Sequence, residues 1–314
     1  MRHGLGAWKT PFGSMNTILA NLSGSDANLD GLPTETPIAL TGNPEAGKSI
    51  LALELAYKAA AQLKGNIVLL RTEKLGSQLP AMWEPVFSRK YGAPDTTLYV
   101  EEALSAEAML AFNGYKIMIV MSKPKQNKKT GEWSKPKKMP VQLEVDVENS
   151  PLTKYIRDKG VRVVIYDSLT APFNAIAAGG QQNLPERFNV TEMFFQSVKL
   201  GFYGTGAVPI TCNHVSYNPA SMFLTRESFR AKGGKSIEHN HDYIFYLEKQ
   251  SRGRYGLSQR TLWVQRHPRL KDWRQVALLW LDDDGYREMK KEEVEALKAG
   301  EKGTVKAGAE PEAE

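Results

Sequence analysis

Residues 38–58 read Ile-Ala-Leu-Thr-Gly-Asn-Pro-Glu-Ala-Gly-Lys-Ser-Ile-Leu-Ala-Leu-Glu-Leu-Ala-Tyr-Lys. Gly42 and Gly47 are separated by four residues, and Lys48 and Ser49 follow at once, which is the spacing of a phosphate-binding loop. Residues 37–41 are typical of a short buried strand, and apolar residues recur at helical spacing after Ser49. The stretch therefore predicts the strand, loop and helix in which such a loop works.

The backbone and side chains of this loop have separate roles in the predicted site. Glycine lets the backbone curl closely enough for successive N–H groups to face a polyphosphate. Lys48 would reach the β- and γ-phosphate oxygens, Ser49 would offer its hydroxyl to Mg²⁺, and the next helix would point its positive end at the anion. We expect ATP and Mg²⁺ as cofactors, with ATP bound by Gly42, Asn43, Pro44, Glu45, Ala46, Gly47, Lys48, Ser49 and Ile50.

Length and composition limit the class of protein. The 314-residue chain can form one large α/β domain with insertions, or two small domains. Its single cysteine, Cys212, excludes an internal disulfide framework and fits a reducing compartment. No apolar run is long enough to span a bilayer, and the first residues lack the apolar core of a signal peptide. We therefore expect a cytoplasmic protein with no membrane partner.

Alternating strand and helix patterns predict an α/β fold with a central, mostly parallel twisted sheet flanked by helices. The predicted core spans residues 31–289, after an N-terminal arm at 1–30 and before a short helix and disordered tail at 290–314. Strands are expected at residues 37–41, 66–72, 98–100, 161–167, 207–213, 242–247, 260–264 and 276–280. Helices are expected at 14–22, between Ser49 and Gly65, and at 78–92, 152–159 and 185–203, and a loop is expected at 215–236.

Residues 115–148 predict an inserted β-hairpin with a long mobile tip. Strand patterns at 115–121 and 141–147 flank a segment that is rich in lysine and contains Trp133. Residues 116–138 hold eight lysines and one glutamate, a local charge of +7, so the net charge of +6 leaves only −1 for the rest of the chain. Such a tip would bind nucleic acid or an acidic protein, or would simply be solvated; we favour nucleic acid.

Polar side chains end three of the predicted strands. Asp167 would reach the Mg²⁺ shell, Glu73 would orient the attacking water, and His214 would sense the γ-phosphate. Carboxyl ends of parallel strands meet at one edge of a sheet, so these groups should face the phosphate loop. The competing interpretations are that Asp167 is an ordinary acid at the end of a buried strand, that Glu73 is a surface glutamate, and that His214 is a structural histidine. We expect a catalytic set of Glu73, Lys48 and His214, and Ser49 and Asp167 as metal ligands.

The predicted loop at 215–236 combines cations with aromatic residues, which suits phosphates and unpaired bases. A solvated loop is the alternative interpretation. The candidate DNA-binding residues are Arg226, Arg230 and Lys232 in this loop and Lys125, Lys128 and Lys129 in the hairpin. His239, His241 and Asp242 follow the loop but lack the spacing of a strong zinc site.

Collinear motifs between about residues 30 and 288 resemble the RecA/RadA recombinase family of ATPases. Beyond the phosphate loop, the matching segments are Arg71-Thr-Glu73, Tyr166-Asp-Ser-Leu-Thr-Ala-Pro-Phe173, Asn183-Leu-Pro-Glu-Arg187, Val208-Pro-Ile-Thr-Cys-Asn-His-Val215, Gly233-Gly-Lys-Ser-Ile-Glu-His239 and His267-Pro-Arg-Leu270. The resemblance implies a RecA-type core that assembles head to tail, with ATP between subunits and DNA along an inner channel. It places DNA loops at 174–183 and 216–234, and Arg266 and Pro268 against a neighbouring subunit's ATP.

The chain also departs from the family pattern. His214 stands where the family has glutamine, and Arg266 stands where the family often has aspartate. The first DNA loop also lacks the arginine that is usual in the family. These differences indicate a divergent RadA-like or RadB-like paralogue. The first hypothesis is a DNA-dependent ATPase of homologous recombination and DNA repair. It would bind single-stranded DNA and promote strand pairing, and double-stranded DNA is a further candidate ligand. The alternatives are a hexameric replicative-helicase motor and a regulatory paralogue with weak turnover that acts on another recombinase.

Overall fold

The computed structural model describes residues 6–23, 31–73, 78–127, 129–134, 138–173, 184–217, 229–231, 235–249, 259–268 and 273–296. Among these residues, ten strands form one mixed sheet: β3 (Ile38–Gly42), β4 (Asn66–Arg71), β5 (Leu98–Glu102), β8 (Val161–Asp167), β9 (Val208–Tyr217), β10 (Phe229–Ala231), β11 (Tyr243–Lys249), β12 (Gln259–Arg266), β13 (Arg274–Asp282) and β14 (Gly285–Glu288). Two small sheets pair β1 (Ala7–Trp8) with β2 (Leu32–Pro33), and β6 (Tyr115–Met121) with β7 (Lys138–Val145). The helices are α1 (Gly13–Ser23), α2 (Lys48–Leu63), α3 (Leu79–Tyr91), α4 (Ala106–Phe112), α5 (Pro151–Asp158), α7 (Leu184–Phe202) and α8 (Lys235–Asn240).

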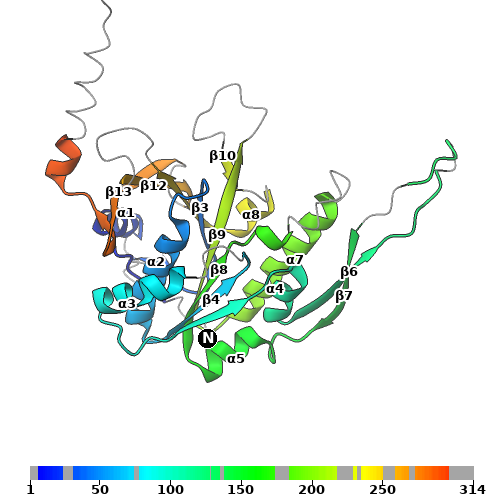
Figure 1. The fold of residues 1–314 in the computed structure, drawn as a ribbon, viewed down its shortest axis with the longest axis horizontal. Helices are drawn as coiled ribbons and strands as arrows, with labels where there is room; N and C mark the ends of the chain where they lie inside the picture. The colour runs from blue at the N-terminus through cyan, green and yellow to red at the C-terminus, as the bar shows by residue number, and fades with distance from the viewer. Residues whose placement is uncertain are drawn as a thin grey trace, which may run out of the picture.

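The large sheet runs in the order β14-β13-β12-β11-β3-β9-β8-β4-β5, and β10 pairs with β9 outside this path (Figure 1). From β11 to β5 all neighbouring strands are parallel, whereas β12, β13 and β14 add in antiparallel pairs. The parallel strands are continuous apolar runs, as expected where both faces of a sheet are covered. In β8, for example, Val163, Val164, Ile165 and Tyr166 are all fully buried.

Helices cover both faces of the sheet because successive strand residues alternate between two cores. Ile67 and Leu69 of β4 pack in a cluster with α1, α2 and α3, whereas Val68 and Leu70 pack with α4, α5, α7 and α8. Odd-numbered residues of β4 therefore face the same side as the helix that follows the phosphate loop.

A buried ion pair joins α2 to α3 and β14. Glu54 is fully buried, its Oε1 accepts from Lys90 Nζ at 2.7 Å and from Tyr91 Oη at 2.6 Å, and its Oε2 accepts from Tyr286 N at 2.6 Å. Lys90 Nζ also donates to the carbonyl oxygens of Asp284 and Tyr286. Burial raises the pKa of Glu54, and the charge of Lys90 opposes that rise. The network ties three elements that are distant in sequence.

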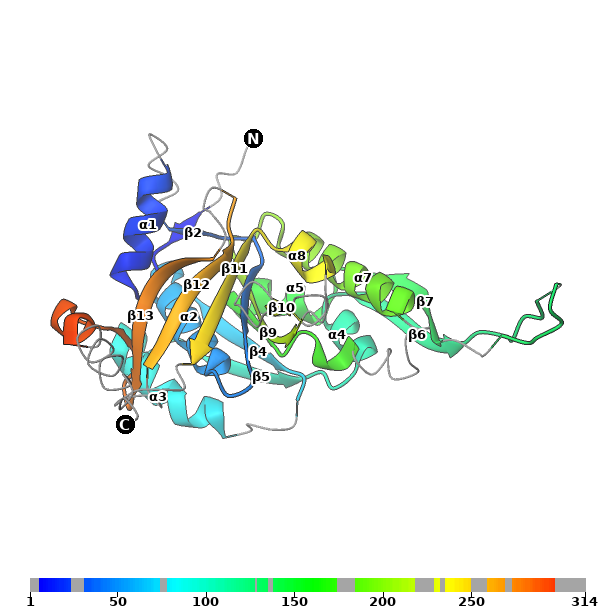
Figure 2. The same cartoon turned by 90° about the horizontal axis from the view of Figure 1, so that it is seen from above.

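The β6–β7 ribbon projects from the body as an arm (Figures 1 and 2). Its base is anchored: Tyr115 and Ile117 are buried, and Asn113, two residues before β6, is fully buried between two partners. Asn113 Nδ2 donates to Ser197 Oγ at 3.0 Å, and its Oδ1 accepts from Tyr166 Oη at 2.9 Å. The arm therefore leaves the body from a fixed point.

The expected α/β fold is confirmed, and each predicted strand and helix at 14–22, 37–72, 78–121 and 141–213 has an observed counterpart within a few residues. The expectation of a loop throughout 215–236 is wrong, because β9 continues to Tyr217, pairs with β10, and is followed by α8 from Lys235. In the hairpin tip, Gln126 and Trp133 form an antiparallel bridge. The short α4 and the edge strand β14 were not predicted.

Residues 291–296 form the helix expected near the end of the chain, whereas the predicted disordered tail from 297 onward lies outside the described residues. Parts of the expected N-terminal arm, 1–5 and 24–30, also lie outside them. Within the described part of the chain, no helix combines the length and apolar character needed to cross a bilayer.

Candidate functional site

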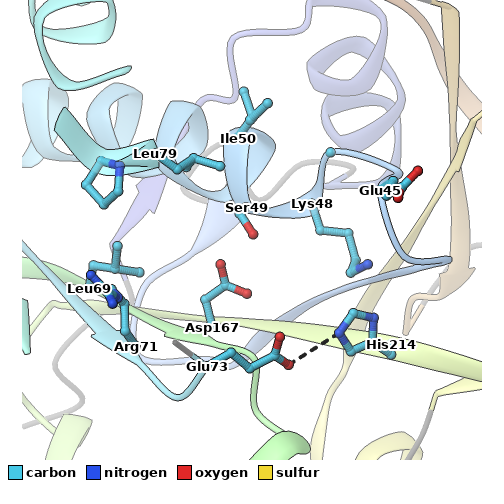
Figure 3. Close-up of a pocket in the computed structure, with 12 residues that line it drawn as sticks. Glu45, Lys48, Ser49, Ile50, Leu69, Arg71, Glu73, Leu79, Asp167 and His214 are labelled. Carbon is cyan, nitrogen blue, oxygen red and sulfur yellow. Dashed lines mark ion pairs between the residues drawn. The ribbon is translucent and has the colours of Figure 1, made fainter. Parts of the chain in front are cut away.

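A cavity of about 310 Å³ opens where the carboxyl ends of β4, β8 and β9 meet the first turn of α2 (Figure 3). This is the edge at which open α/β sheets bind ligands. The cavity is lined by Glu45, Gly47, Lys48, Ser49, Ile50, Leu69, Arg71, Glu73, Leu79, Pro80, Asp167 and His214. The predicted metal ligands and catalytic residues therefore share one pocket with five of the predicted ATP-binding residues, Glu45 and Gly47–Ile50. The other four, Gly42, Asn43, Pro44 and Ala46, do not line it.

Two loop positions require glycine. Gly42 has φ +157°, and a Cβ there would lie 2.6 Å from the carbonyl oxygen of Leu247. Gly47 has φ +96°, and a Cβ there would lie 2.2 Å from Tyr286 Oη. Gly47 is also the N-cap of α2 and supplies no side-chain cap. The first turn of α2 thus presents backbone N–H groups and the positive end of its dipole to the cavity, a setting that suits a phosphate.

Lys48 is held inside the loop. Its Nζ donates to the carbonyl oxygens of Gly42 at 3.0 Å and Asn43 at 2.8 Å, and only 7% of its surface is exposed. Burial lowers the pKa of Lys48, while the acidic groups around it, including Asp167 and Glu73, oppose that shift. A phosphate oxygen would offer this ammonium group a stronger, charge-assisted hydrogen bond than a carbonyl does.

The back of the loop is braced by two residues from distant strands. Arg260 Nε of β12 donates to the carbonyl oxygen of Ala46 at 2.7 Å. Tyr286 Oη of β14 lies 3.4 Å from the same oxygen and 3.3 Å from that of Gly47. Neither residue was predicted from the sequence, because both contacts join positions more than 200 residues apart. Both residues fix the backbone of the loop at Ala46, just before α2 begins.

Asp167 and Ser49 are placed for a divalent cation. Figure 3 shows the Ser49 hydroxyl and the Asp167 carboxylate pointing toward one another across the cavity. Burial raises the pKa of Asp167, and a hydrogen bond from Ser49 and the charge of Lys48 oppose the rise. Mg²⁺ in nucleotide sites takes few protein oxygens and fills its shell with phosphate oxygens and water. This donor pair fits that mode, and no cluster of three or more His, Cys, Asp or Glu among the described residues suggests another metal site.

Glu73 and His214 lie next to one another in the cavity (Figure 3). Glu73 Oε1 accepts from Ser168 Oγ at 2.8 Å and lies 3.4 Å from His214 Nε2 (Figure 3). His214 pairs in register with Gly42, which fixes it beside the loop. Burial, and then the charge of Lys48, lowers the pKa of His214, so the ring is neutral at pH 7. Its Nδ1 is buried and has no hydrogen-bond partner among the described residues.

Arg71 lines the pocket but was not predicted from the sequence to belong to the site. It pairs in register with Asp167 and shares the α2-facing side of β4 with Leu69. Its Nη2 lies 3.1 Å from Glu102 Oε1, while its buried Nε has no partner among the described residues. The period-two alternation of β4 was the available signal, because residues 69, 71 and 73 all face the cavity.

The chain matches no protein-family model and no curated protein sequence, so the chemistry of the pocket follows from its geometry. That geometry is specific. A glycine-built loop, a buried lysine, a hydroxyl, three carboxylates and a neutral histidine converge at the carboxyl edge of a parallel sheet. Such a site can bind a polyphosphate with a divalent cation and can place a base beside the terminal phosphate.

Other predicted site residues lie elsewhere. Arg266 pairs in register with Ile244, which pairs with Ala39 near the start of β3, so it lies at the sheet edge opposite the pocket. Its Nη1 donates to the carbonyl oxygen of Glu238, and Pro268 nearby is exposed. Lys125 and Lys129 are exposed on the arm. Arg226, Lys232 and Lys128 lie outside the described residues, as does the predicted DNA loop at 174–183, and Arg230 is described only as part of β10.

The His239–Asp242 segment is not a metal site. His241 is fully buried, and its two ring nitrogens contact the carbonyl oxygen of Ile237 at 2.8 Å and Thr211 Oγ1 at 2.9 Å. Burial lowers the pKa of His241 to about 4. This histidine is a satisfied neutral core residue. Cys212 is likewise buried, and burial raises the pKa of its thiol, which makes it a poor nucleophile.

Proposed function

We propose that this chain is an ATP-hydrolysing enzyme of the RecA/RadA recombinase type, with turnover that depends on single-stranded DNA. The observation that carries the proposal is the convergence of Lys48, Ser49, Glu73, Asp167 and His214 in one cavity. Each of the five has the side-chain chemistry that phosphoryl transfer to water requires.

Each group in the pocket has its own role in the proposed reaction. The loop N–H groups and Lys48 bind and orient the phosphates, and Ser49 with Asp167 would hold Mg²⁺. When bound, Mg²⁺ neutralises phosphate charge and aligns the terminal group. Glu73, held by Ser168, accepts a proton from the attacking water or orients it. Neutral His214 has a single ring N–H, which would turn from Glu73 to donate to the terminal phosphate.

The strand that carries His214 also supports a link to DNA. β9 extends past His214 to Tyr217, where it pairs with β10 just outside residues 218–228. In the proposal, contact between His214 and the phosphate is transmitted along this ladder to the DNA loop at 216–234. The loops at 174–183 and 216–234, including Arg226, Arg230 and Lys232, would bind the strand.

A head-to-tail homo-oligomer, as a filament or a ring, fits the position of Arg266. Because Arg266 and Pro268 lie at the edge opposite their own pocket, they can contact ATP only in a neighbouring subunit. A regulatory paralogue with weak turnover is the second candidate. It is favoured by the histidine at position 214, because its imidazole has a lowered pKa and, when neutral, offers one N–H donor where a glutamine amide offers two.

Nucleotide binding and hydrolysis in two variants test the proposal. We expect Lys48→Ala to weaken binding of a fluorescent ATP analogue by at least about tenfold, a loss of about 1.4 kcal/mol. We expect Glu73→Gln to retain binding within about twofold but to lower phosphate release by roughly a hundredfold or more, as loss of a general base does. Glu148→Gln, which alters an exposed carboxylate, is the control and should match the wild type. Unchanged turnover in Glu73→Gln would remove Glu73 from the mechanism.

A further inference from the structure

The β6–β7 arm carries charge in an unusual distribution. Its base is acidic or paired: Lys116 Nζ lies 2.6 Å from Glu144 Oε2, and Asp146 and Glu148 follow. Toward the tip, Lys123, Lys125 and Lys129 are all exposed, and none of the three has an ion-pair partner among the described residues. The positive charge is thus concentrated at the end that projects farthest from the body (Figure 2).

Trp133 stands among these cations with 66% of its surface exposed. A tryptophan gains stability from burial, so one left this exposed on a projecting tip is typical of an interaction site. Its position is fixed by backbone pairing. Trp133 bridges Gln126, Ser134 N donates to the carbonyl oxygen of Lys125 at 2.8 Å, and Asn127 N donates to that of Glu132 at 2.8 Å. The ring is therefore presented on a short ladder and does not hang from an irregular loop.

Cations around an exposed aromatic ring suit one ligand above others. Single-stranded nucleic acid offers both a phosphate chain for ammonium groups and unpaired bases that stack on an aromatic face. A duplex offers phosphates but keeps its bases stacked on each other. An acidic peptide offers carboxylates but has no general need for the ring.

We infer that the arm tip is a second binding site for single-stranded nucleic acid, in which Trp133 stacks on an unpaired base while Lys123, Lys125 and Lys129 neutralise the neighbouring phosphates. This inference rests on the proposed function, because it takes the strand at the ATPase core to be the one that the arm also grips. The inference gives the arm a function that the core loops do not have: the arm would hold the bound nucleic-acid strand away from the body of the protein.

The test compares two labelled probes of equal length, a mixed-sequence single-stranded oligonucleotide and the same backbone with abasic sites throughout. Fluorescence anisotropy of the full chain measures affinity at several salt concentrations. Trp133→Ala is expected to weaken binding of the base-bearing probe by about fivefold to a hundredfold and to leave the abasic probe within about twofold. Trp133→Phe, which keeps a ring, should recover most of the affinity. Tyr203→Ala removes an aromatic that is 83% exposed outside the arm, and should change neither probe.

The lysines give a separate signature. The Lys125→Gln/Lys129→Gln double variant should weaken both probes and flatten the slope of log affinity against log salt by about 1.4, or about 0.7 per lost phosphate contact. An equal loss on both probes in Trp133→Ala, or no loss on either, overturns the inference. If DNA still stimulates ATP hydrolysis in that case, the proposed function stands without the arm. Binding of the arm to poly-glutamate in preference to either oligonucleotide would also overturn it and would identify an acidic protein as the partner.

Discussion

Replacing Gly47 by alanine tests whether the phosphate loop is clamped from behind. The substitution places a Cβ at φ +96° and 2.2 Å from Tyr286 Oη, so it introduces backbone strain and a steric overlap together. The left-handed conformation costs a non-glycine residue about 1–3 kcal/mol, and overpacking a tight site adds about 1–3 kcal/mol. We expect Gly47→Ala to lower the free energy of unfolding by roughly 2–5 kcal/mol.

Tyr286→Phe separates the two contributions. Without the hydroxyl, the nearest ring atom is Cζ at 3.5 Å, which is ordinary contact, so only the backbone strain remains. Tyr286→Phe removes two long hydrogen bonds, at 3.3 and 3.4 Å, and the contact of the hydroxyl with Arg260, and the single variant measures this cost by itself. Gly47→Ala should therefore cost about 1–3 kcal/mol less in the Tyr286→Phe background.

Urea unfolding of the wild type, both single variants and the double variant measures this coupling energy. The same four proteins should rank in the same order for affinity toward an ATP analogue, because the overlap pushes the loop out of shape. If Gly47→Ala costs the same in both backgrounds, within about 0.5 kcal/mol, the loop does not rest on Tyr286 and the reasoning is refuted.

Two further predictions concern buried charge. Lys90→Met should destabilise the fold by about 3–5 kcal/mol, because it leaves the fully buried Glu54 carboxylate without its cation, and Glu54→Gln in the same background should recover part of that loss in denaturant unfolding. His241 has a pKa of about 4 in the folded chain and about 6.5 when unfolded, so the unfolded state binds the proton first as pH falls. The contribution of neutral His241 to the free energy of unfolding is fully present above pH 6.5. It is lost as the pH falls toward 4, which lowers the free energy of unfolding by roughly 3 kcal/mol. Unfolding of the wild type and His241→Gln at pH 7 and pH 4 measures it, and an equal loss in both proteins would contradict the assignment.

The sequence was most informative where local rules decide the structure. The glycine spacing, the helix after Ser49 and the apolar strands each follow from backbone freedom or from apolar periodicity. Once those strands are parallel, their ends must meet at one edge. This is why Glu73, Asp167 and His214 could be expected near the loop without a structure, and why all three line the cavity.

The sequence was least informative where distant segments meet. The Arg260 and Tyr286 contacts to the loop, and the Glu54–Lys90 pair, depend on how edge strands and helices pack, and no local pattern encodes them. The β9 extension was missed because it exists only through pairing with residues 229–231.

ATP hydrolysis measured with and without single-stranded DNA, at two salt concentrations, tests the central claim most directly. The account predicts that DNA strongly stimulates phosphate release in the wild type, that higher salt weakens this effect, and that Glu73→Gln abolishes it while ATP still binds. Slow turnover that DNA does not change would contradict the recombinase-type motor and favour the regulatory paralogue. Turnover that persists in Glu73→Gln would contradict the mechanism assigned to this pocket.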